Sequence, residues 1–386
     1  MMEIERSQPT RFGEARRTPG AHGYVAYFPA PLVRSIELPS STVNLLADTE
    51  ASLGELSAVG RLLPNPDLLI RPYMLREAVS STRIEGTQAE MSEVFDVDAA
   101  RSDPNPDVEE VVNYVSAMNW GLAQLDRLPL SSRLILEIHR RLMTGVRGRN
   151  LSPGEFRTTQ NWIGPPGSTI ETATFVPPPP TELGDLLSDW EKFANEKPEM
   201  PLLVQNALLH VQFESIHPFL DGNGRLGRLL LIFFLVARKR LGTPILYLSS
   251  YLEQHRSSYY EALQLAHESG DPFPWIDLFL TAVRTQSADG VIRSQKIIEL
   301  RDRYRQAAGE LGTSNAMDVV DLICENPVIN ARKVEESLDV SRPTALRLLQ
   351  RMEEKGVLTE EEKGARGQRR YVAQEMMNAV TGGSGE

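Results

Sequence analysis

The sequence predicts a mainly α-helical protein with one short β-hairpin and, towards its C-terminal end, a winged helix-turn-helix. Apolar residues recur at helix spacing through most of the segments 108–142 and 183–280. Residues 151–180 interrupt this periodicity because they are rich in Gly, Pro and Thr, and such segments form irregular loops or short hairpins. Residues 313–373 follow a helix, helix, turn, helix and hairpin pattern, which resembles the winged architecture.

The first hundred residues combine extended and helical patterns. Residues 23–27 (Gly-Tyr-Val-Ala-Tyr) have the composition of an extended segment. We expect a helix to begin after Pro72 and to end at Gly86, which can adopt the left-handed conformation of a helix C-cap. Residues 87–90 (Thr-Gln-Ala-Glu) have the pattern of a capping box and predict the start of another helix.

Changes of pattern along the chain predict four parts. Residues 1–105 form an N-terminal region, which ends in a linker at residues 103–106 (Asp-Pro-Asn-Pro). Residues 106–283 form a helical core, and residues 284–312 form a polar, charged helical connector. Residues 313–386 form a C-terminal module, whose last few residues we expect to fray.

Composition and charge narrow the class of protein. The 386 residues carry a formal net charge of −11, which argues against a general nucleic-acid binder, because phosphates are neutralised by a clustered excess of Lys and Arg. The single cysteine, Cys324, excludes an internal disulfide and a Cys-based zinc site and suits a reducing cytoplasm. No signal peptide is recognisable, and the longest apolar run, Leu229 to Ala237, is shorter than the roughly 20 residues of a membrane span. We therefore expect a cytoplasmic protein without a membrane partner.

Residues 217–228 (His-Pro-Phe-Leu-Asp-Gly-Asn-Gly-Arg-Leu-Gly-Arg) carry the most specific chemical pattern in the sequence. The glycines on either side of Asn223 permit unusual backbone angles and the close approach of a ligand. An apolar helix follows at once, and its N-terminus can bind an anion through free N–H groups and the helix dipole. Arg225 and Arg228 are three residues apart and can share one helix face, where their guanidinium groups suit phosphate oxygens.

Two more side chains in this stretch indicate a transfer reaction. Asp221 would be repelled by phosphates unless Mg²⁺ bridges them. His217 has an unperturbed pKa of about 6.5 and can remove a proton from an incoming hydroxyl, which is typically worth roughly 10²–10⁴-fold in rate. A turn before a helix, with a histidine packed in the core, is the alternative. The joint occurrence of all these residue types within one short stretch favours phosphoryl or nucleotidyl transfer.

This stretch resembles the Fic motif, His-x-Phe-x-Asp/Glu-Gly-Asn-Gly-Arg-x-x-Arg, and every defined position is filled. The resemblance implies a helical Fic core and the transfer of AMP from ATP to Ser, Thr or Tyr hydroxyls of a target protein. It implies that His217 is the general base and that Asp221 holds Mg²⁺ on the α- and β-phosphates, with Arg228 at the γ-phosphate. The nucleotide-binding residues that it implies are Gly222, Asn223, Gly224, Arg225, Leu226, Gly227 and Arg228.

Residues 161–176 resemble the flap of Fic proteins, a segment that aligns the backbone of the target as an added strand. Strand addition is physically reasonable because backbone pairing tolerates varied target sequences. An ordinary surface loop is the alternative. The flap residues that we assign to the binding site are Asn161, Trp162, Ile163 and Gly164.

Several aromatic and histidine residues outside the motif are also candidates. Tyr259 and Tyr260 resemble a tyrosine pair whose first member lies by the adenine, although half-buried packing is the commoner role of such a pair on a helix. His267 stands where similar proteins often have an Asn near the ribose. His139 and His210 lie in apolar helical stretches, and we expect both to be structural.

Residues 81–86 (Ser-Thr-Arg-Ile-Glu-Gly) resemble the Fic inhibitory motif, Ser/Thr-x-x-x-Glu-Gly/Asn, placed before the core in the same chain. The resemblance implies that Ser81 and Glu85 belong to an inhibitory helix, and that Glu85 pairs with Arg228 and withholds it from the γ-phosphate. A solvated carboxylate is the alternative, slightly disfavoured because Glu near a helix C-terminus opposes the dipole. In some similar proteins this Glu positions a water that removes AMP, and the sequence does not separate the two roles.

The C-terminal module has the elements of a helix-turn-helix. Residues 331–338 form an amphipathic pattern, Ser341 can cap a second helix that runs to Lys355, and residues 357–359 and 370–372 alternate like two strands. Glutamates are interspersed among the arginines of this module. The arginines that could meet DNA phosphates are Arg342, Arg347, Arg351, Arg366, Arg369 and Arg370.

AMP transfer from ATP is the first of three hypotheses about function. DNA binding and protein interaction suit the C-terminal module about equally, and the sequence does not decide whether the chain forms a homodimer. A DNA-binding regulator whose Fic module senses a nucleotide is the second hypothesis, but an intact His217 favours an enzyme. A donor other than ATP that carries a phosphate-containing group is the third.

Overall fold

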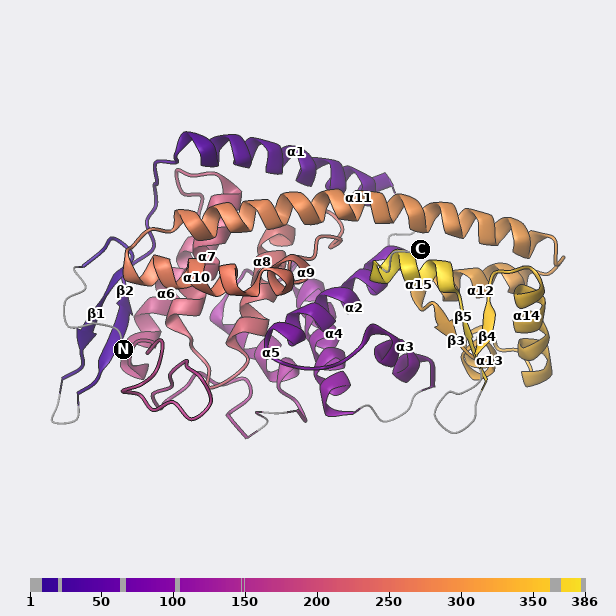
Figure 1. The fold of residues 1–386 in the computed structure, drawn as a ribbon, viewed down its shortest axis with the longest axis horizontal. Coiled ribbons are helices and arrows are strands. Elements are labelled where there is room, and N and C mark those ends of the chain that lie inside the picture. Colours follow the sequence, from indigo (N-terminus) through magenta and orange to yellow (C-terminus); the bar gives the residue numbers. More distant parts are fainter. Residues whose placement is uncertain are drawn as a thin grey trace. The chain divides into compact units, whose positions relative to one another are not determined.

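The structure, a computed structural model, describes residues 9–19, 23–62, 67–100, 105–146, 148, 150–361 and 369–382. Within them most residues are helical, and the strands form two small antiparallel sheets (Figure 1). The prediction of a mainly α-helical protein is confirmed. No helix in this part of the chain combines the length and the apolar character that a membrane span requires.

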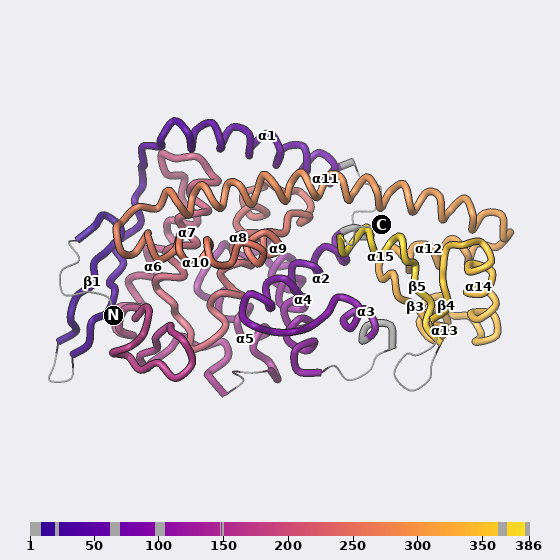
Figure 2. Tube along the Cα trace, in the orientation of Figure 1, coloured from indigo at the N-terminus to yellow at the C-terminus, as the bar shows by residue number. Residues whose placement is uncertain are grey.

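The order of the elements can be followed along the trace in Figure 2. As far as α6 they are β1 (Gly13–Arg17), β2 (Val25–Pro29), α1 (Ser40–Leu62), α2 (Asp67–Ile84), α3 (Met91–Ala100), α4 (Pro106–Gln124), α5 (Ser132–Leu142), the 3₁₀ turn η2 (Pro180–Glu182) and α6 (Leu183–Asn195). They continue with α7 (Leu202–Ile216), α8 (Asn223–Ala237), α9 (Ser249–Gln254), α10 (Arg256–Glu268), α11 (Phe273–Gly309), α12 (Ser314–Glu325), β3 (Val328–Ile329), α13 (Ala331–Leu338), α14 (Arg342–Glu354), β4 (Thr359–Glu361), β5 (Arg370–Val372) and α15 (Gln374–Thr381).

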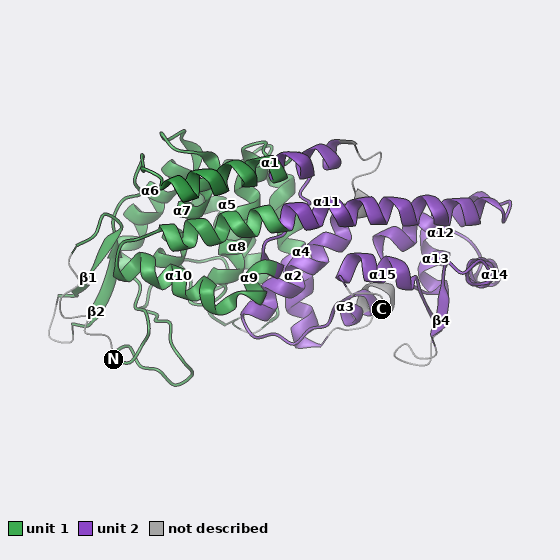
Figure 3. Ribbon diagram, turned by 45° about the horizontal axis from the view of Figure 1, so that its top comes forward, with its two compact units in different colours: residues 1–52, 116–241, 251–285 green, residues 53–115, 242–250, 286–386 purple. Residues whose placement is uncertain are grey.

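The chain divides into two compact units, which Figure 3 shows in different colours. Unit 1 consists of Met1–Ser52, Ser116–Leu241 and Tyr251–Thr285, and unit 2 of Leu53–Val115, Gly242–Ser250 and Gln286–Glu386. The motif at residues 217–228 therefore belongs to unit 1, whereas the expected inhibitory residues and the C-terminal module belong to unit 2. The four parts expected from the sequence, with their boundaries, stay a prediction.

The centre of unit 1 is the helix pair α7 and α8. Every residue from Leu203 to Phe213 of α7 is buried, as is every residue from Leu229 to Leu235 of α8. A helix that is buried on all sides must lie inside a layer of other helices, and α7 packs against both α6 and α8. The long apolar run of the sequence is thus a buried helix, and the motif lies between the two most buried helices of the unit.

The N-terminal hairpin of unit 1 continues into the flap. β1 and β2 pair antiparallel, with Gly13 opposite Pro29 at one end, so the extended pattern of the sequence corresponds to β2. The Tyr27 N–H donates to the Val176 carbonyl at 2.8 Å. One residue earlier, Phe175 forms an antiparallel bridge with Ile163. The short hairpin expected within residues 151–180 therefore consists of a single antiparallel bridge.

Unit 2 joins α2 and α3 to the C-terminal module. Helix α12 and helix α15 both contact α2, and β3 and α13 contact α3. The three strands of the module pair antiparallel in the order β3-β5-β4. Helix α13 has the expected bounds, and α14 follows Ser341 at the N-cap. These elements are confirmed, while the classification of the module as a winged helix-turn-helix stays a prediction.

Two arginines expected to meet DNA are engaged with carboxylates. Arg370 forms ion pairs with Asp96 and Glu361, and Arg369 lies 3.3 Å from Glu360. A DNA phosphate would have to displace a carboxylate at either position. DNA binding, a homodimer and a cytoplasmic location stay predictions.

Helix α2 begins earlier than the sequence predicts. A start after Pro72 is expected, but the helix begins at Asp67 and includes Pro72 within it. The proline removes one intrahelical hydrogen bond at this position. Packing within unit 2 offsets that loss, because the next residue, Tyr73, stacks on Tyr247 with ring centroids 5.8 Å apart. The helix ends as predicted before Gly86, which has φ 98°.

The capping box before α3 lies three residues later than predicted. The sequence places it at Thr87 to Glu90, but α3 begins at Met91. The Glu93 carboxylate accepts the N–H of Glu90 at 2.9 Å, which is the return bond of a capping box. Glu90, rather than Thr87, directly precedes the first turn of α3, so Glu90 occupies the N-cap position.

Some predictions fall outside the described residues. They concern residues 103–104 of the expected linker, Arg366 in the C-terminal module and residues 383–386 of the expected frayed end. The rest of the linker is helical or caps a helix. Asn105 accepts the N–H of Val108 at 2.9 Å, and Pro106 is the first residue of α4.

Candidate active site

The motif forms the connection between α7 and α8. Helix α7 ends at Ile216, and its C-cap residue, His217, has a left-handed backbone with φ 47° and ψ 61°. Gly222, with φ 81°, directly precedes α8. A Cβ atom at position 222 would lie 2.8 Å from the Met143 sulfur. Both the backbone angle and the adjacent side chain therefore require glycine at this position.

Asn223 holds the loop of the motif closed. Its side chain accepts the N–H of Phe219 and donates to the Phe219 carbonyl, with both distances 2.9 Å. The Asn161 side chain donates to the same carbonyl at 2.8 Å. Since polar backbone groups in a buried loop need partners, these bonds fix the loop and join the flap to it.

The first turn of α8 is suited to an anion. No side chain caps the helix, and the Leu226 N–H donates to the Gly222 carbonyl at 3.1 Å. The N–H groups that precede Leu226 in the helix have no acceptor within it, and the positive end of the helix dipole lies at the same place. Such a helix start binds phosphates readily.

The charged side chains of the motif lie near this helix start. Arg225 and Arg228 of α8 are buried, with 4% and 1% of their surfaces exposed. Asp221 is more open, with 39% of its side chain exposed, and its Oδ1 lies 3.6 Å from Nη2 of Arg225. The site thus combines two buried guanidinium groups with one solvent-accessible carboxylate.

Asp221 fits a magnesium ion that arrives with a nucleotide. Among the described residues, no cluster of three His, Cys, Asp or Glu side chains could hold a metal alone. Mg²⁺ needs only one or two carboxylates where phosphate oxygens supply further ligands. The Asp221 carboxylate is held by the N–H of Gly222, 2.6 Å from Oδ1. The donor set therefore suits a Mg²⁺·nucleotide complex rather than a free metal ion.

His139 of α5 holds the same loop from outside the motif. Its ring stacks on Phe219, with centroids 3.7 Å apart. Nδ1 accepts the Gly154 N–H at 2.9 Å, and Nε2 lies 2.9 Å from the Asp221 carbonyl oxygen. A carbonyl only accepts, so Nε2 carries the proton and the ring is neutral. Burial lowers the pKa of His139 to about 4, in agreement with this arrangement.

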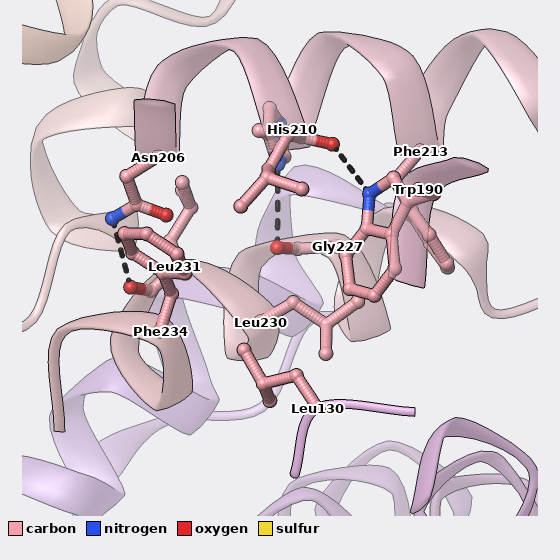
Figure 4. Close-up of a pocket in the computed structure, with 10 residues that line it drawn as sticks. Leu130, Trp190, Asn206, His210, Phe213, Gly227, Leu230, Leu231 and Phe234 are labelled. Carbon is pink, nitrogen blue, oxygen red and sulfur yellow. Dashed lines mark hydrogen bonds between the residues drawn. The ribbon is translucent and has the colours of Figure 1, made fainter. Parts of the chain in front are cut away.

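His210 of α7 lies against the first turns of α8 (Figure 4). Its Nδ1 lies 3.2 Å from the Gly227 carbonyl, and its Nε2 accepts the Tyr259 hydroxyl at 2.8 Å. His210 and Gly227 line a cavity of about 10 Å³, which is room for about one water molecule and too small for a nucleotide. Tyr259 is 1% exposed and Tyr260 42%. Tyr259 is packed in the core, and its contact with adenine stays a prediction.

Comparison with known proteins agrees with the geometry of this site. Residues 43–123 match the family described as Fic/DOC family N-terminal, and residues 129–235 match the one described as Fic/DOC family. The second match includes the whole motif. The chain contains a Fic/DOC domain at residues 129–235.

Curated Fic proteins of fruit flies align with part of the chain. The protein adenylyltransferase Fic of Drosophila grimshawi is 32% identical over 226 residues, which cover 52% of this chain and 42% of the fly protein. The protein of the same name from Drosophila virilis is 35% identical over 170 residues, which cover 43% and 31%. The chain thus spans less than half the length of these relatives.

Fic proteins of known structure share the fold. A Fic family protein from Desulfovibrio desulfuricans G20 has a TM-score of 0.59 at 21% identity, over 90% of this chain and 98% of its own. Residues 134–508 of Fic-1 from C. elegans give a TM-score of 0.50 at 21% identity, over 67% of this chain and 74% of that chain. At these identities the likeness concerns the fold alone.

Residues 161–176, which resemble a Fic flap, present apolar side chains to solvent. Trp162 is 44% exposed and Ile163 is 40% exposed, although Ile163 is held by its bridge to Phe175. The Phe175 ring stacks on His267, with centroids 4.4 Å apart. His267 therefore packs against the segment of residues 161–176.

The expected inhibitory residues lie at the end of α2 in unit 2. Ser81 is buried in the last turns of the helix, and Glu85 follows its last residue, Ile84. The Thr87 N–H donates to the Thr82 carbonyl at 3.3 Å, which closes the helix end. Arg228 belongs to unit 1, so the pairing of Glu85 with Arg228 stays a prediction.

Residues without a predicted role in the site also contact the Fic motif. Besides His139, they include Glu214, whose Oε2 lies 4.0 Å from Nδ1 of His217, and Arg157, which donates to the His217 carbonyl at 2.9 Å. Glu214 lies one helical turn before His217, so its spacing could have indicated it. No local pattern in the sequence distinguishes Arg157 or His139.

We expect the neutral ring of His139 to make the protein less stable in mild acid. Its pKa of about 4 lies below the unfolded value of about 6.5, so the unfolded state binds more protons as the pH falls between these values. The free energy of unfolding should therefore fall more steeply in the wild type than in His139→Gln, by up to about 1.4 kcal/mol per pH unit.

Urea unfolding at several pH values between about 7.5 and 4.5 would measure both slopes. Burial also lowers the pKa values of His210 and His267, each to about 3. Both residues are present in the two proteins, so the difference in slope reports on His139. Parallel slopes would contradict the neutral, buried ring.

Proposed function

We propose that the chain is a protein adenylyltransferase, which transfers AMP from ATP to a Ser, Thr or Tyr hydroxyl of a target protein. One observation carries the proposal: a single short loop joins a histidine at the end of α7 to the uncapped start of α8, which bears two buried arginines. The names of the fly relatives describe the same reaction and support it.

ATP binds with its phosphates at the start of α8. The N–H groups of Asn223 and Gly224 and the guanidinium of Arg225 contact the phosphate oxygens, and Arg228 binds the γ-phosphate. Asp221 would hold Mg²⁺, which would neutralise negative charge on the phosphates and so favour attack at phosphorus. The loop bonds of Asn223 and His139 keep this site in place before the nucleotide arrives, which is the preorganisation that transfer reactions require.

His217 removes the proton of the target hydroxyl. As the proton leaves, the hydroxyl oxygen attacks the α-phosphorus, and the bond from that phosphorus to the oxygen shared with the β-phosphate breaks. Pyrophosphate departs, the target carries AMP through a phosphodiester, and the imidazolium returns its proton to solvent. The Glu214 carboxylate, 4.0 Å from Nδ1, stabilises the positive charge that forms on the ring.

Glu85 restrains the reaction. By pairing with Arg228 it takes the cation that would bind the γ-phosphate, and ATP then binds in a pose from which the α-phosphorus cannot be attacked in line. Removal of AMP from the target, by a water that Glu85 positions, is compatible with the same residue. Both roles need Glu85 near the nucleotide, and they differ in whether the modified target is a substrate.

The position of the transferred label tests the reaction. Glu85→Gly protein is incubated with Mg²⁺ and ATP that is labelled at either the α- or the γ-phosphate, alone and with a cell lysate as target. We expect label on protein from the α-phosphate only, with a mass gain of one AMP per modified hydroxyl. Label from the γ-phosphate would indicate phosphoryl transfer instead, and the absence of label from both would contradict the proposal.

A further inference from the structure

Arg157 lies between α5 and η2, outside the motif, and is 2% exposed. Its side chain donates to three backbone carbonyls: Nε to that of His217 at 2.9 Å, and Nη2 to those of Pro178 at 2.6 Å and Ile216 at 3.3 Å. Its own N–H donates to the Pro218 carbonyl at 2.9 Å. The side chain and the N–H of Arg157 together thus bind the carbonyls of three consecutive residues at the start of the motif, Ile216, His217 and Pro218.

The guanidinium of Arg157 has no carboxylate partner among the described residues, and its Nη1 is buried without an acceptor. Burial lowers its pKa to about 10, so the side chain remains charged at neutral pH. Buried charges are usually paired with opposite charges because desolvation opposes them. Here the backbone carbonyls of Pro178, Ile216 and His217 provide the compensation.

These carbonyls lie at the C-terminal end of α7. Ile216 is the last residue of the helix and His217 is its C-cap. Carbonyls at this end carry the partial negative charge of the helix dipole and lack a donor within the helix. His217 also has a left-handed backbone, which is unfavourable for a residue with a Cβ and persists only where its surroundings hold it. The Arg157 guanidinium supplies donors to these carbonyls and, through the His217 carbonyl, holds the left-handed backbone.

We infer that Arg157 is a positioning residue for the transfer reaction proposed above: it fixes the backbone of His217 and thereby where the imidazole lies relative to the start of α8. Its bond to Pro178 ties the same backbone to the chain that follows the flap. The base and the end of the flap are therefore held by one side chain, so a target aligned by the flap meets an imidazole whose position is already set.

The arrangement requires the shape of the guanidinium as well as its charge. The carbonyls of His217 and Pro178 are approached by different nitrogens, Nε and Nη2. A lysine ammonium carries all its donors on one atom and cannot reproduce this fork. Arg157→Lys therefore keeps the charge and loses the geometry, which makes it the informative variant.

The test measures turnover in the Glu85→Gly protein as a function of ATP concentration. Adding Arg157→Lys should lower kcat about tenfold and adding Arg157→Ala about 100-fold, because misplacing a reacting group by about 1 Å costs rate on this scale. KM for ATP should change by less than about threefold, because an interaction that acts in the transition state changes kcat rather than ground-state binding.

Arg34→Lys is the matched control. Arg34 of unit 1 is less buried than Arg157, with 35% of its side chain exposed. It also donates to a backbone carbonyl, that of Leu32, but its charge is balanced by Asp189 and Glu196. It makes no contact with the motif, so its replacement should leave kcat unchanged. Methylguanidine added to Arg157→Ala should restore at least part of kcat, because the small cation can bind the same carbonyls.

Several results would overturn the inference. They are an unchanged kcat in Arg157→Lys, a rise in KM with kcat unchanged, or an equal loss in Arg34→Lys. If Arg157→Ala does not fold, Arg157→Lys decides the matter. Absence of transfer by the Glu85→Gly parent would count against the proposed function instead. The ¹⁵N ring resonances of His217 test Arg157 without any transfer: they should shift in Arg157→Lys and not in Arg34→Lys, and unchanged resonances would refute the positioning role.

Discussion

Replacing His217 by Asn in the Glu85→Gly protein should lower the rate of AMP transfer roughly 10²–10⁴-fold, the usual contribution of a general base. Asparagine tolerates the left-handed backbone better than most residues do, so the φ of 47° at this position can be kept. The loop and the start of α8 should then be unchanged. ATP should still bind with an affinity within about twofold of the parent, because the base contributes to the transition state and not to ground-state binding.

The rate is measured with ATP labelled at the α-phosphate, and the affinity by calorimetry. His255→Asn is a matched control: His255 precedes α10 and packs on Tyr251, outside the proposed machinery, so the variant should transfer AMP at the parental rate. A His217→Asn protein that keeps more than about a tenth of the parental rate would rule out proton removal by this imidazole.

Glu85→Gly should raise the rate of AMP transfer roughly 10- to 100-fold over the wild type, the range expected for charge-assisted hydrogen bonds between Arg228 and the γ-phosphate. Breaking a buried ion pair usually costs about 3–5 kcal/mol because one charge is left without a partner. In the ATP-bound state Arg228 gains the γ-phosphate, so this cost should not appear there. Glu85 follows the last residue of α2, so glycine at this position should leave the helix intact.

Two further variants separate this restraint from a general loosening of the protein. Glu90→Gly removes an exposed carboxylate that pairs with Arg83 at 3.1 Å and should leave the rate at the wild-type level. Arg228→Ala added to Glu85→Gly should abolish the gain. A gain that survives the loss of Arg228, or a Glu85→Gly protein no faster than the wild type, would show that the pair does not restrain the enzyme.

The core of the site could be predicted from the sequence because its chemistry is contained in one continuous stretch. His217, Asp221 and the residues around Asn223 follow one another closely, and the apolar periodicity on either side indicates the two helices that flank them. The start of α2 could not be predicted in the same way. Pro72 is a local signal against a helix, and the stacking of Tyr73 on Tyr247, which favours the helix, involves a residue far along the chain.

Arg157 and His139 could not be predicted for a different reason. Their hydrogen-bond partners at the motif are backbone carbonyls, which are the same for every residue type, so no pairing of polar side chains in the sequence indicates the contact. The partners are also distant: Arg157 is 60 residues from His217, and His139 is 82 residues from Asp221. Only the folded backbone brings these carbonyls to the side chains that bind them.

If residues 161–176 align a target as proposed, their hydrogen bonds determine from which side the target backbone can approach. Within the described residues, the Phe175 and Ile163 main chains bond to each other and the Val176 carbonyl accepts from Tyr27, so both neighbours of the 174–176 segment are segments of this chain. Successive residues of an extended chain direct their N–H and C=O groups to opposite sides, and those of Trp162 and Gly164 therefore face away from Phe175. In the proposed reaction an added strand would join this outer side, which would set the direction from which the acceptor hydroxyl enters. The N-terminal hairpin lies on the opposite side, where Tyr27 bonds to Val176.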